Sequence, residues 1–466
     1  MSHKNNNISL ELYPTKPNER IVGTWDYTLM MVALTIATSI FFLGWISQIL
    51  GLSLVQTLVS SFIGSTVFAV LLYLNGHPGV KYGIPYPIQL RMTFGSKGAI
   101  LPMLMVVIVD MIWYGIDGFI AAWAMTEMIL VILGWPSSRI LAEGLTYTPI
   151  TFVVFLVALA VIGTGKIKSI KWIDILSGPL IFLFFGWFVF YMLGMPQFAH
   201  KTIPVWEGGV QWLSSEFLLN TAIQTAWWGM TVPNICDICR YNKSTKALAY
   251  GHILGLVLPQ VVGTALGYVG TYLAGGNLSP IDIIAIYSPT AALGVLGLFF
   301  SFLATGTTAL TGYLPGLMNA FIRIFKFSWN RVLVIVTVIS FFIAPWYIKD
   351  SLGIAYQLLN ITWYYSMFLG PVVGVMIFDY WIVRKRRIVV EELYNDHNSS
   401  MYQNGVFWAG IGSFAIGIIG QYISAVIQGK FYYAFSIPLP GLELVWYYGF
   451  VISGLTYYIW MKFYRK

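Results

Sequence analysis

The chain has 466 residues, of which 58% are apolar and only 9% are Asp, Glu, Lys or Arg, whereas ordinary soluble proteins carry roughly 25% charged residues. So few charged groups could not cover a soluble fold of this size, and the composition excludes a soluble enzyme, a disordered scaffold and a disulfide-stapled secreted domain. The net charge of +8 comes without a basic stripe interleaved with aromatic residues, so we expect no nucleic-acid partner.

Long apolar segments follow one another along the chain and predict an all-α polytopic membrane protein with twelve transmembrane helices, since ~20 residues cross a bilayer. In chain order the segments are 25–50, 54–75, 99–133, 147–164, 172–195, 214–236, 248–275, 290–322, 331–348, 352–382, 405–428 and 443–462. A cytoplasmic N-terminal segment (1–24) and a cytoplasmic connection (383–404) remain, and neither is long enough for a soluble domain. No apolar stretch precedes a cleavage site in the first 20 residues, so we expect no cleavable signal peptide.

The basic residues predict the orientation of these spans. All but four of the 26 Lys and Arg residues fall on one side of the membrane in this arrangement. The four exceptions are Arg139, Lys201, Lys349 and Lys430. Because basic loops stay in the cytoplasm, both termini are expected there, in a multi-pass protein of the plasma membrane.

The third span carries three carboxylates, which are functional candidates because a charge in hydrocarbon is costly. Asp110 and Asp117 lie seven residues apart with Trp113 between them, so all three share one helix face. Glu127 is rotated off that face and lies nearer the extracellular end. We assign a function to Asp117, which lies mid-span beside an aromatic residue, and expect Asp110 and Glu127 to meet hydroxyls or water.

The sixth span contains two residues that weaken a helix, Gly229 and Pro233, shortly after Trp227 and Trp228. Proline removes a backbone donor, and glycine has low helix propensity. Free backbone groups at membrane depth persist only where they line a cavity or bind a ligand. The pattern predicts either a broken helix at a transport site or a simple proline kink.

The eighth span brings two hydroxyls, from Thr307 and Thr308, to the face of Ala304. Hard oxygen ligands without a full carboxylate suit a monovalent cation such as sodium. The alternative is that each threonine bonds the carbonyl four residues before it.

Neither an enzyme nor a bound cofactor is expected. The five His residues are scattered, and Cys236 and Cys239 form a lone C-x-x-C without further zinc ligands nearby. No phosphate-binding loop is present to drive transport by hydrolysis. A channel would need a filter of repeated carbonyls or charged rings, and none is visible.

Four segments together resemble the nucleobase–cation symporter family 1, which includes uracil, cytosine and allantoin permeases and a bacterial hydantoin transporter. They are the segments 18–23, 82–98, 234–241 and 370–384. The third contains Asp237 and ends in Arg-Tyr, as in the family. The similarity covers about residues 18–395 and is weak in the last two spans.

The resemblance implies a leucine-transporter-like fold with two inverted five-helix repeats, residues 25–195 and 214–382. Two additional helices and a short cytoplasmic tail follow in residues 405–466. Spans one and six should be the broken pair. Span one has neither Gly nor Pro between Thr24 and Leu43, so its break cannot be located from the sequence.

The resemblance also implies a flat heterocycle held between Trp113 and Trp228, whose rigid π-faces would grip a planar ring. The other positions implied for the substrate are Ala37, Asp117, Trp227, Gly229 and Tyr313. Those implied for sodium are the carbonyls of Ala33, Ile36 and Ala304 and the hydroxyls of Thr307 and Thr308.

Four substrate positions depart from the hydantoin transporter. Asp117 and Ala37 replace glutamines, Tyr313 replaces an asparagine, and Trp227 replaces a glycine. An anion, a methyl group and a phenol thus stand where the relative has amides. These changes make hydantoin a poor candidate and favour an amino-bearing, amidine-like or cationic heterocycle.

The sequence therefore predicts a secondary active symporter, acting as a monomer in the lipid bilayer by alternating access. It would import a small planar nitrogen heterocycle (a nucleobase, allantoin, a hydantoin or a vitamin) with sodium. The alternative is a proton-coupled transporter in which Asp117 is the protonation site, because a desolvated carboxyl can titrate near neutral pH.

Overall fold

The computed structural model describes residues 12–464 apart from 165–170, 326, 395–403 and 436–443. Parts of the expected N-terminal segment and of the 383–404 connection therefore lie outside the described residues. Regular structure in the described part is helical, apart from one isolated bridge between Val22 and Asn242. In each of the twelve predicted apolar segments, the described residues are mainly helical.

The first half of the chain forms seven α-helices among the described residues, and one of them shows defined capping at both ends. They are α1 (Thr24–Thr35), α2 (Ser39–Ile49), α3 (Leu54–Tyr82), α4 (Tyr86–Phe94), α5 (Ile100–Ile132), α6 (Ser137–Thr164) and α7 (Lys171–Leu193). The Ser53 hydroxyl accepts the Gln56 N–H at the start of α3, and Gly83 ends this helix with φ 73°, a conformation that favours glycine.

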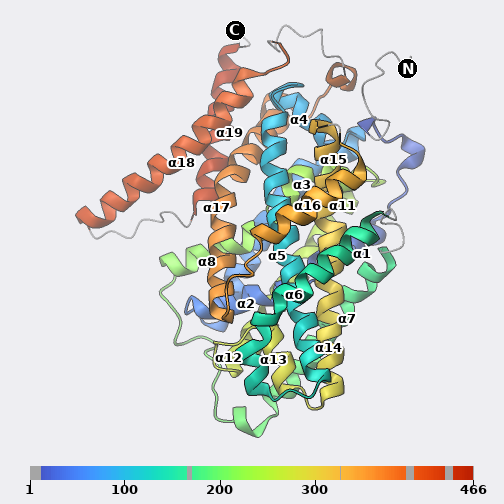
Figure 1. The fold of residues 1–466 in the computed structure, drawn as a ribbon. Helices are drawn as coiled ribbons and strands as arrows, with labels where there is room; N and C mark the ends of the chain where they lie inside the picture. Colours follow the sequence, from blue (N-terminus) through green and yellow to red (C-terminus); the bar gives the residue numbers. More distant parts are fainter. Residues whose placement is uncertain (1–11, 165–170, 326, 395–403, 436–443, 465–466) are drawn as a thin grey trace.

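The second half contains helices of 4 to 28 residues and three π-helical segments among the described residues. They are α8 (Ser215–Ala226), α9 (Thr231–Asn234), α10 (Cys236–Cys239), α11 (Thr245–His252), η5 (Ile253–Val257), α12 (Leu258–Leu273), α13 (Pro280–Tyr287), α14 (Ala291–Thr308), η6 (Ala309–Tyr313), α15 (Leu314–Phe325), α16 (Trp329–Ile343), α17 (Ser351–Ile377), η7 (Phe378–Val383), α18 (Trp408–Phe435) and α19 (Val445–Tyr464). Figure 1 shows α4 and the end of α19 at one end of the bundle and α12 and α13 at the other.

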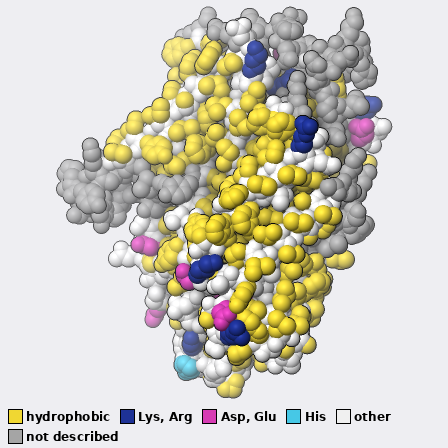
Figure 2. All heavy atoms as spheres, viewed as in Figure 1, with side chains coloured by type: hydrophobic (Ala, Val, Ile, Leu, Met, Phe, Trp, Pro, Cys, Tyr) yellow, Lys and Arg dark blue, Asp and Glu magenta, His cyan; other side chains and the backbone are white. Residues whose placement is uncertain are grey.

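The molecule is a multi-pass membrane protein. Seven described helices are long and apolar enough to cross a membrane, and the bent pair α1 and α2 would make an eighth. The count of twelve crossings remains a prediction. Apolar side chains cover the middle of the face drawn in Figure 2, and charged ones lie mostly toward its two ends, as a bilayer requires.

The first predicted span is broken although it contains no helix breaker at that point. The axes of α1 and α2 differ by 55°. The Ala37 N–H donates to the Thr35 carbonyl, and the Thr38 N–H donates to the Thr305 hydroxyl of α14. The Ala33 carbonyl thereby loses the N–H of Ala37, its usual partner four residues on.

A continuous helical segment formed by α11, η5 and α12 lies along both halves of this broken span. A Cβ on Gly44 of α2 would collide with the Thr264 carbonyl, and one on Gly267 of α12 with the Phe41 carbonyl. Backbones can approach this closely only where small residues meet. On the α1 side, the Tyr27 hydroxyl lies 3.0 Å from His252 Nε2.

Candidate functional site

The helix of the sixth span stops at Ala226 and resumes at Thr231. Between them the Gly229 N–H bonds the Ala226 carbonyl at 2.6 Å, one residue short of the α-helical spacing. The Tyr365 hydroxyl of α17 donates to the same carbonyl at 2.7 Å. A Cβ on Gly229 would lie 2.8 Å from this oxygen, so the tight turn favours glycine. The predicted break lies here, and Pro233 falls in α9, after it.

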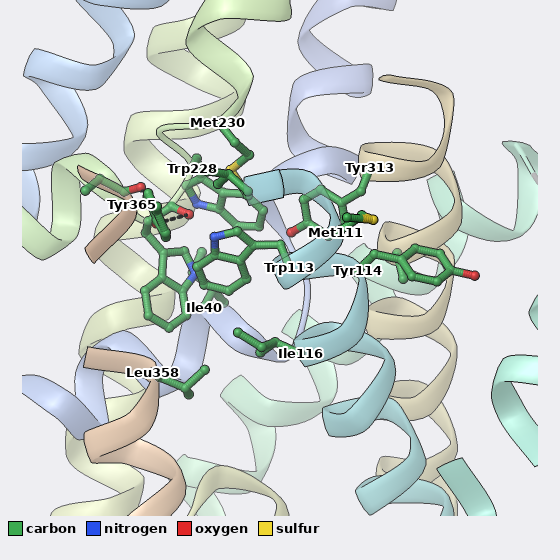
Figure 3. Packing of buried hydrophobic residues seen from close by; sticks show 14 of the residues in the cluster. Ile40, Met111, Trp113, Tyr114, Ile116, Trp228, Met230, Tyr313, Leu358 and Tyr365 are labelled. Carbon is green, nitrogen blue, oxygen red and sulfur yellow. Dashed lines mark hydrogen bonds between the residues drawn. The ribbon is translucent and has the colours of Figure 1, made fainter. Parts of the chain in front are cut away.

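Aromatic rings from three helices surround this break. The rings of Trp113 and Trp227 meet edge to face with centroids 4.8 Å apart, and the ring centroids of Tyr365 and Trp113 are 6.2 Å apart. Figure 3 shows Trp228 beside Trp113, with Tyr365 on one side and Tyr313 on the other. Trp113 and Trp228 are 1% and 3% exposed. The structure thus brings the two predicted stacking residues together in a buried aromatic cluster.

Asp117 is the buried carboxyl group of this cluster. Its Oδ2 accepts the Tyr313 hydroxyl at 2.9 Å. The Ser39 hydroxyl, at the start of α2, lies within hydrogen-bonding reach of the carboxyl group, and Oδ1 has no partner of good geometry among the described residues. No described Lys or Arg forms an ion pair with Asp117.

Several hydrogen-bonding groups in the cluster are buried without a partner among the described residues. They are the indole N–H groups of Trp113, Trp227 and Trp228 and Oδ1 of Asp117. A buried polar group without a partner is costly. Donors and a carboxylate that point into one buried region can instead be satisfied by a planar ligand with carbonyl oxygens and an N–H or amino group.

Two contributors to this region were missed by the sequence analysis. Tyr365 follows Trp363 and Tyr364, and such an aromatic run does not reveal which ring faces the interior. The position of Ser39 beside Asp117 could not be predicted, because the break that precedes Ser39 contains neither Gly nor Pro. Ala37, a predicted substrate position, is fully buried within this break.

The predicted ion ligands lie where α1, α7 and α14 meet. A Cβ on Gly178 of α7 would lie 2.9 Å from the Ile36 carbonyl oxygen, and the Ser177 hydroxyl is 3.2 Å from that of Thr307. The Ile40 N–H bonds Ala37, so the Ile36 carbonyl lacks its usual helical donor. Ser177 is a further oxygen near these ligands that the sequence analysis missed.

The two threonine hydroxyls also donate hydrogen bonds to carbonyls four residues earlier in their own helix. This is the alternative to ion binding that the sequence predicts. The Thr308 hydroxyl donates to the Ala304 carbonyl at 2.9 Å, and that of Thr307 donates to Leu303 at 2.9 Å. A donating hydroxyl keeps its lone pairs. Both contacts are therefore compatible with the hydroxyl oxygens also binding a cation.

Asp110, for which we expected a hydroxyl or water contact, has no hydroxyl donor among the described residues. It is 1% exposed, and neither of its oxygens has a hydrogen-bond partner among the described residues. Its Oδ2 and the Asn234 amide both lie close to Gly316 of α15.

A family model matches residues 14–453 of this chain, and its description is a permease for cytosine/purines, uracil, thiamine and allantoin. An allantoin permease of Bacillus subtilis (strain 168) is 27% identical over 441 residues, which are 89% of this chain and 84% of the permease. A hydantoin permease of Microbacterium maritypicum is 24% identical over 429 residues, 88% of this chain and 83% of the relative.

Two solved structures of Mhp1 share the fold. Its inward-facing conformation aligns with a TM-score of 0.81 at 20% identity, covering 100% of this chain and 96% of Mhp1. Its closed conformation with bromovinylhydantoin bound, described as a nucleobase-cation-symport-1 family transporter, aligns with a TM-score of 0.77 at 21% identity, covering 98% and 96%.

Proposed function

We propose that this chain, which belongs to the nucleobase–cation symporter family 1 of permeases for cytosine and purines, uracil, thiamine and allantoin, is a secondary active symporter importing a small planar nitrogen heterocycle. Like its relatives it is a transporter and not an enzyme. The observation that carries the proposal is the buried aromatic cluster at the break between α8 and α9. Its unpartnered indole donors and the carboxylate of Asp117 suit a flat ring with both acceptors and a donor.

The substrate would stack between Trp113 and Trp228 and bond to Asp117. Trp227, Gly229, Ala37 and Tyr313 would shape the rest of the site. Nucleobases, allantoin, hydantoins and planar vitamins all have carbonyl and N–H groups in one plane. Because an amino or cationic group of the substrate would neutralise the Asp117 carboxylate, we place amino-bearing heterocycles ahead of neutral imides.

Sodium is the proposed coupling ion. The carbonyls of Ala33 and Ile36 are freed from helical bonding at the break between α1 and α2. They would bind the ion together with the Ala304 carbonyl and the hydroxyls of Thr307 and Thr308. Oxygen ligands alone suit a hard cation.

The overall arrangement proposed is that of two inverted five-helix repeats, residues 25–195 and 214–382, with twelve crossings in all. The first helix of each repeat is broken, as α1 and α2 and then α8 and α9, which supports this division. We propose a monomer with both termini on the cytoplasmic side of the plasma membrane, as the distribution of basic residues indicates, working by alternating access.

A second candidate couples transport to protons through Asp117. It is favoured by one observation: this buried carboxyl has Tyr313 as its donor and no basic partner among the described residues. A carboxyl in such surroundings is neutralised by a proton, a cation or the substrate itself.

The deciding experiment is substrate counterflow in proteoliposomes. Purified protein is first screened for thermal stabilisation by nucleobases, allantoin, hydantoins and vitamins, and vesicles are then loaded with each stabilising compound. A carrier accelerates entry of the labelled compound with no ion gradient present. Imposed sodium or proton gradients then identify the coupling ion. If none of these heterocycles exchanges, the proposed function is wrong.

A further inference from the structure

Asp110 is a buried carboxyl group on α5 that the proposed substrate and ion positions do not use. It is 1% exposed, and neither Oδ1 nor Oδ2 has a hydrogen-bond partner among the described residues. None of the ion pairs recorded for these residues includes it. Asp110 lies two helical turns before Asp117, about 10 Å along the helix axis. A buried carboxylate is costly unless a cation or hydrogen-bond donors accompany it, so Asp110 requires a partner.

The segment that packs against α5 differs at the two carboxyl groups. Tyr313, in η6, donates its hydroxyl to Asp117. Three residues later, Gly316 of α15 lies beside Asp110 and provides no side chain. A Cβ on Gly316 would lie 3.0 Å from Oδ2 of Asp110 and 3.3 Å from the amide nitrogen of Asn234. Outside α15, the described residues bring no other heavy atom within 4 Å of that point. An atom over Gly316 would therefore contact a carboxyl oxygen and an amide group.

Asn234 is held beside this space by a chain of amide hydrogen bonds. Nδ2 of Asn75, on α3, donates to the Val232 carbonyl at 2.6 Å and to the Pro233 carbonyl at 3.2 Å. Nε2 of Gln89, on α4, donates to Oδ1 of Asn75 at 2.8 Å. Two other helices thus fix the backbone just before Asn234. A half-turn of the Asn234 amide exchanges its nitrogen and its oxygen, so this side chain can present an oxygen to the space.

The groups around this space determine the class of ligand that it suits. One carboxylate carries a single negative charge, which a monovalent cation neutralises. Carboxylate and amide oxygens are hard ligands, which suit a hard cation. A transition metal would need more nitrogen, sulfur or carboxylate ligands, and no group of three His, Cys, Asp or Glu residues suited to a metal is found in the described part of the chain. Ionisable residues within membrane spans commonly mark ion pathways.

We propose that Asp110 and Asn234 bind a small monovalent cation in the space over Gly316, and sodium is the cation with which we would test it. This position is separate from the ion position proposed at Thr307 and Thr308, because Gly316 follows Thr308 by eight residues, about 12 Å along a helix. It depends neither on the substrate nor on the coupling ion. In the proposed orientation it lies in the cytoplasmic half of α5, between the aromatic cluster and the cytoplasm.

The test counts the sodium ions bound to purified protein, with radioactive sodium in choline chloride at constant pH and ionic strength. Asp110→Asn removes the charge and keeps the shape, whereas Gly316→Ala keeps the charge and places a methyl group in the space. We expect each variant to bind one sodium ion fewer per chain than the wild type. Gly186→Ala is the matched control, because its added Cβ would lie 3.7 Å from Leu266, and it should bind as many ions as the wild type.

Wild-type ion counts in both Asp110→Asn and Gly316→Ala would overturn the proposal. Loss of an ion in Asp110→Asn alone would also overturn it, since the ion would then lie elsewhere than over Gly316. Gly316→Ala retains the buried carboxylate and gives the count if Asp110→Asn does not fold.

Thr308→Ala separates this position from the proposed coupling site. It should lose a different ion, so the double variant with Asp110→Asn should bind none. If the wild type binds one ion that Thr308→Ala keeps and both Asp110→Asn and Gly316→Ala lose, the position at Asp110 is supported and the coupling site is contradicted. The two proposals can therefore fail independently.

Discussion

Asp117 and Tyr313 stand at two positions where the sequence is expected to differ from the hydantoin transporter, and the structure joins them by a 2.9 Å hydrogen bond. The phenol therefore orients the carboxyl group and satisfies one of its oxygens. The other oxygen remains available to a ligand. Two departures that look independent in the sequence thus form one hydrogen-bonded unit.

Replacing Asp117 by Asn tests the role of its charge. The amide keeps the shape and can still accept from Tyr313, but it cannot pair with a cationic or amino group as strongly. Affinity for such a heterocycle should fall by about 1–3 kcal/mol, the range for losing a charged hydrogen bond, and preference should move toward neutral rings such as uracil. Equilibrium binding of both compound types measures this.

The same variant distinguishes the two coupling candidates. If Asp117 carries the coupled proton, Asp117→Asn should keep substrate affinity while the pH dependence of uptake flattens. Wild-type affinity, selectivity and pH profile together would leave this carboxylate with a structural role alone.

Trp113→Ala removes one proposed stacking face. Aromatic pairs contribute about 0.5–1.5 kcal/mol beyond their buried area, so binding should weaken at least several-fold with expression preserved. Trp113→Phe keeps a ring and should retain part of the affinity. Unchanged affinity in Trp113→Ala and in Trp228→Ala would remove both residues from the site.

At the level of elements, the sequence predicts the helical segments and the break in span six, because Gly229 makes that break visible. The break in span one is invisible for a physical reason: the hydroxyl oxygen of Thr305 on α14 accepts a hydrogen bond from the freed N–H of Thr38. A break stabilised by a distant helix leaves no local signal. Tyr365 was missed similarly, since its role depends on how α17 packs against Ala226.

Gly229→Ala should disturb the break in span six, because the added Cβ would lie 2.8 Å from the Ala226 carbonyl oxygen. We expect weaker substrate binding and slower uptake. Gly186→Ala is the matched control, since a Cβ there would meet only Leu266 at 3.7 Å. Equal transport by both variants would show that the turn tolerates a side chain.

For the whole molecule, the two broken spans place the proposed substrate and ion positions side by side. The segment between α1 and α2 would contribute Ile36 to the proposed ion position and Ala37 to the proposed substrate position. When one ligand binds, it orders this segment. The second ligand then binds without paying the conformational entropy of ordering the segment again. Coupling therefore requires no long path through the protein.

Sodium and substrate should then each tighten the binding of the other by the same factor, as thermodynamic linkage demands. Thr308→Ala should abolish this mutual effect and leave weaker, sodium-independent binding. Thr271→Ala, which removes a buried threonine bonded to its own helix, should keep the effect. Titration calorimetry with and without sodium measures both factors, and indifference to sodium would favour the proton-coupled candidate.

The continuous helical segment α11–η5–α12 packs against both halves of the broken span one. Its backbone touches α2 where Gly44 and Gly267 meet, and its other half contacts α1 through Tyr27 and His252. The 55° bend is therefore set from outside by a neighbouring helix. A change in that angle cannot be a hinge motion of span one alone, because α2 must either carry α12 with it or lose the backbone contact. Any motion of α2 at this side of the molecule would therefore involve a pair of helices.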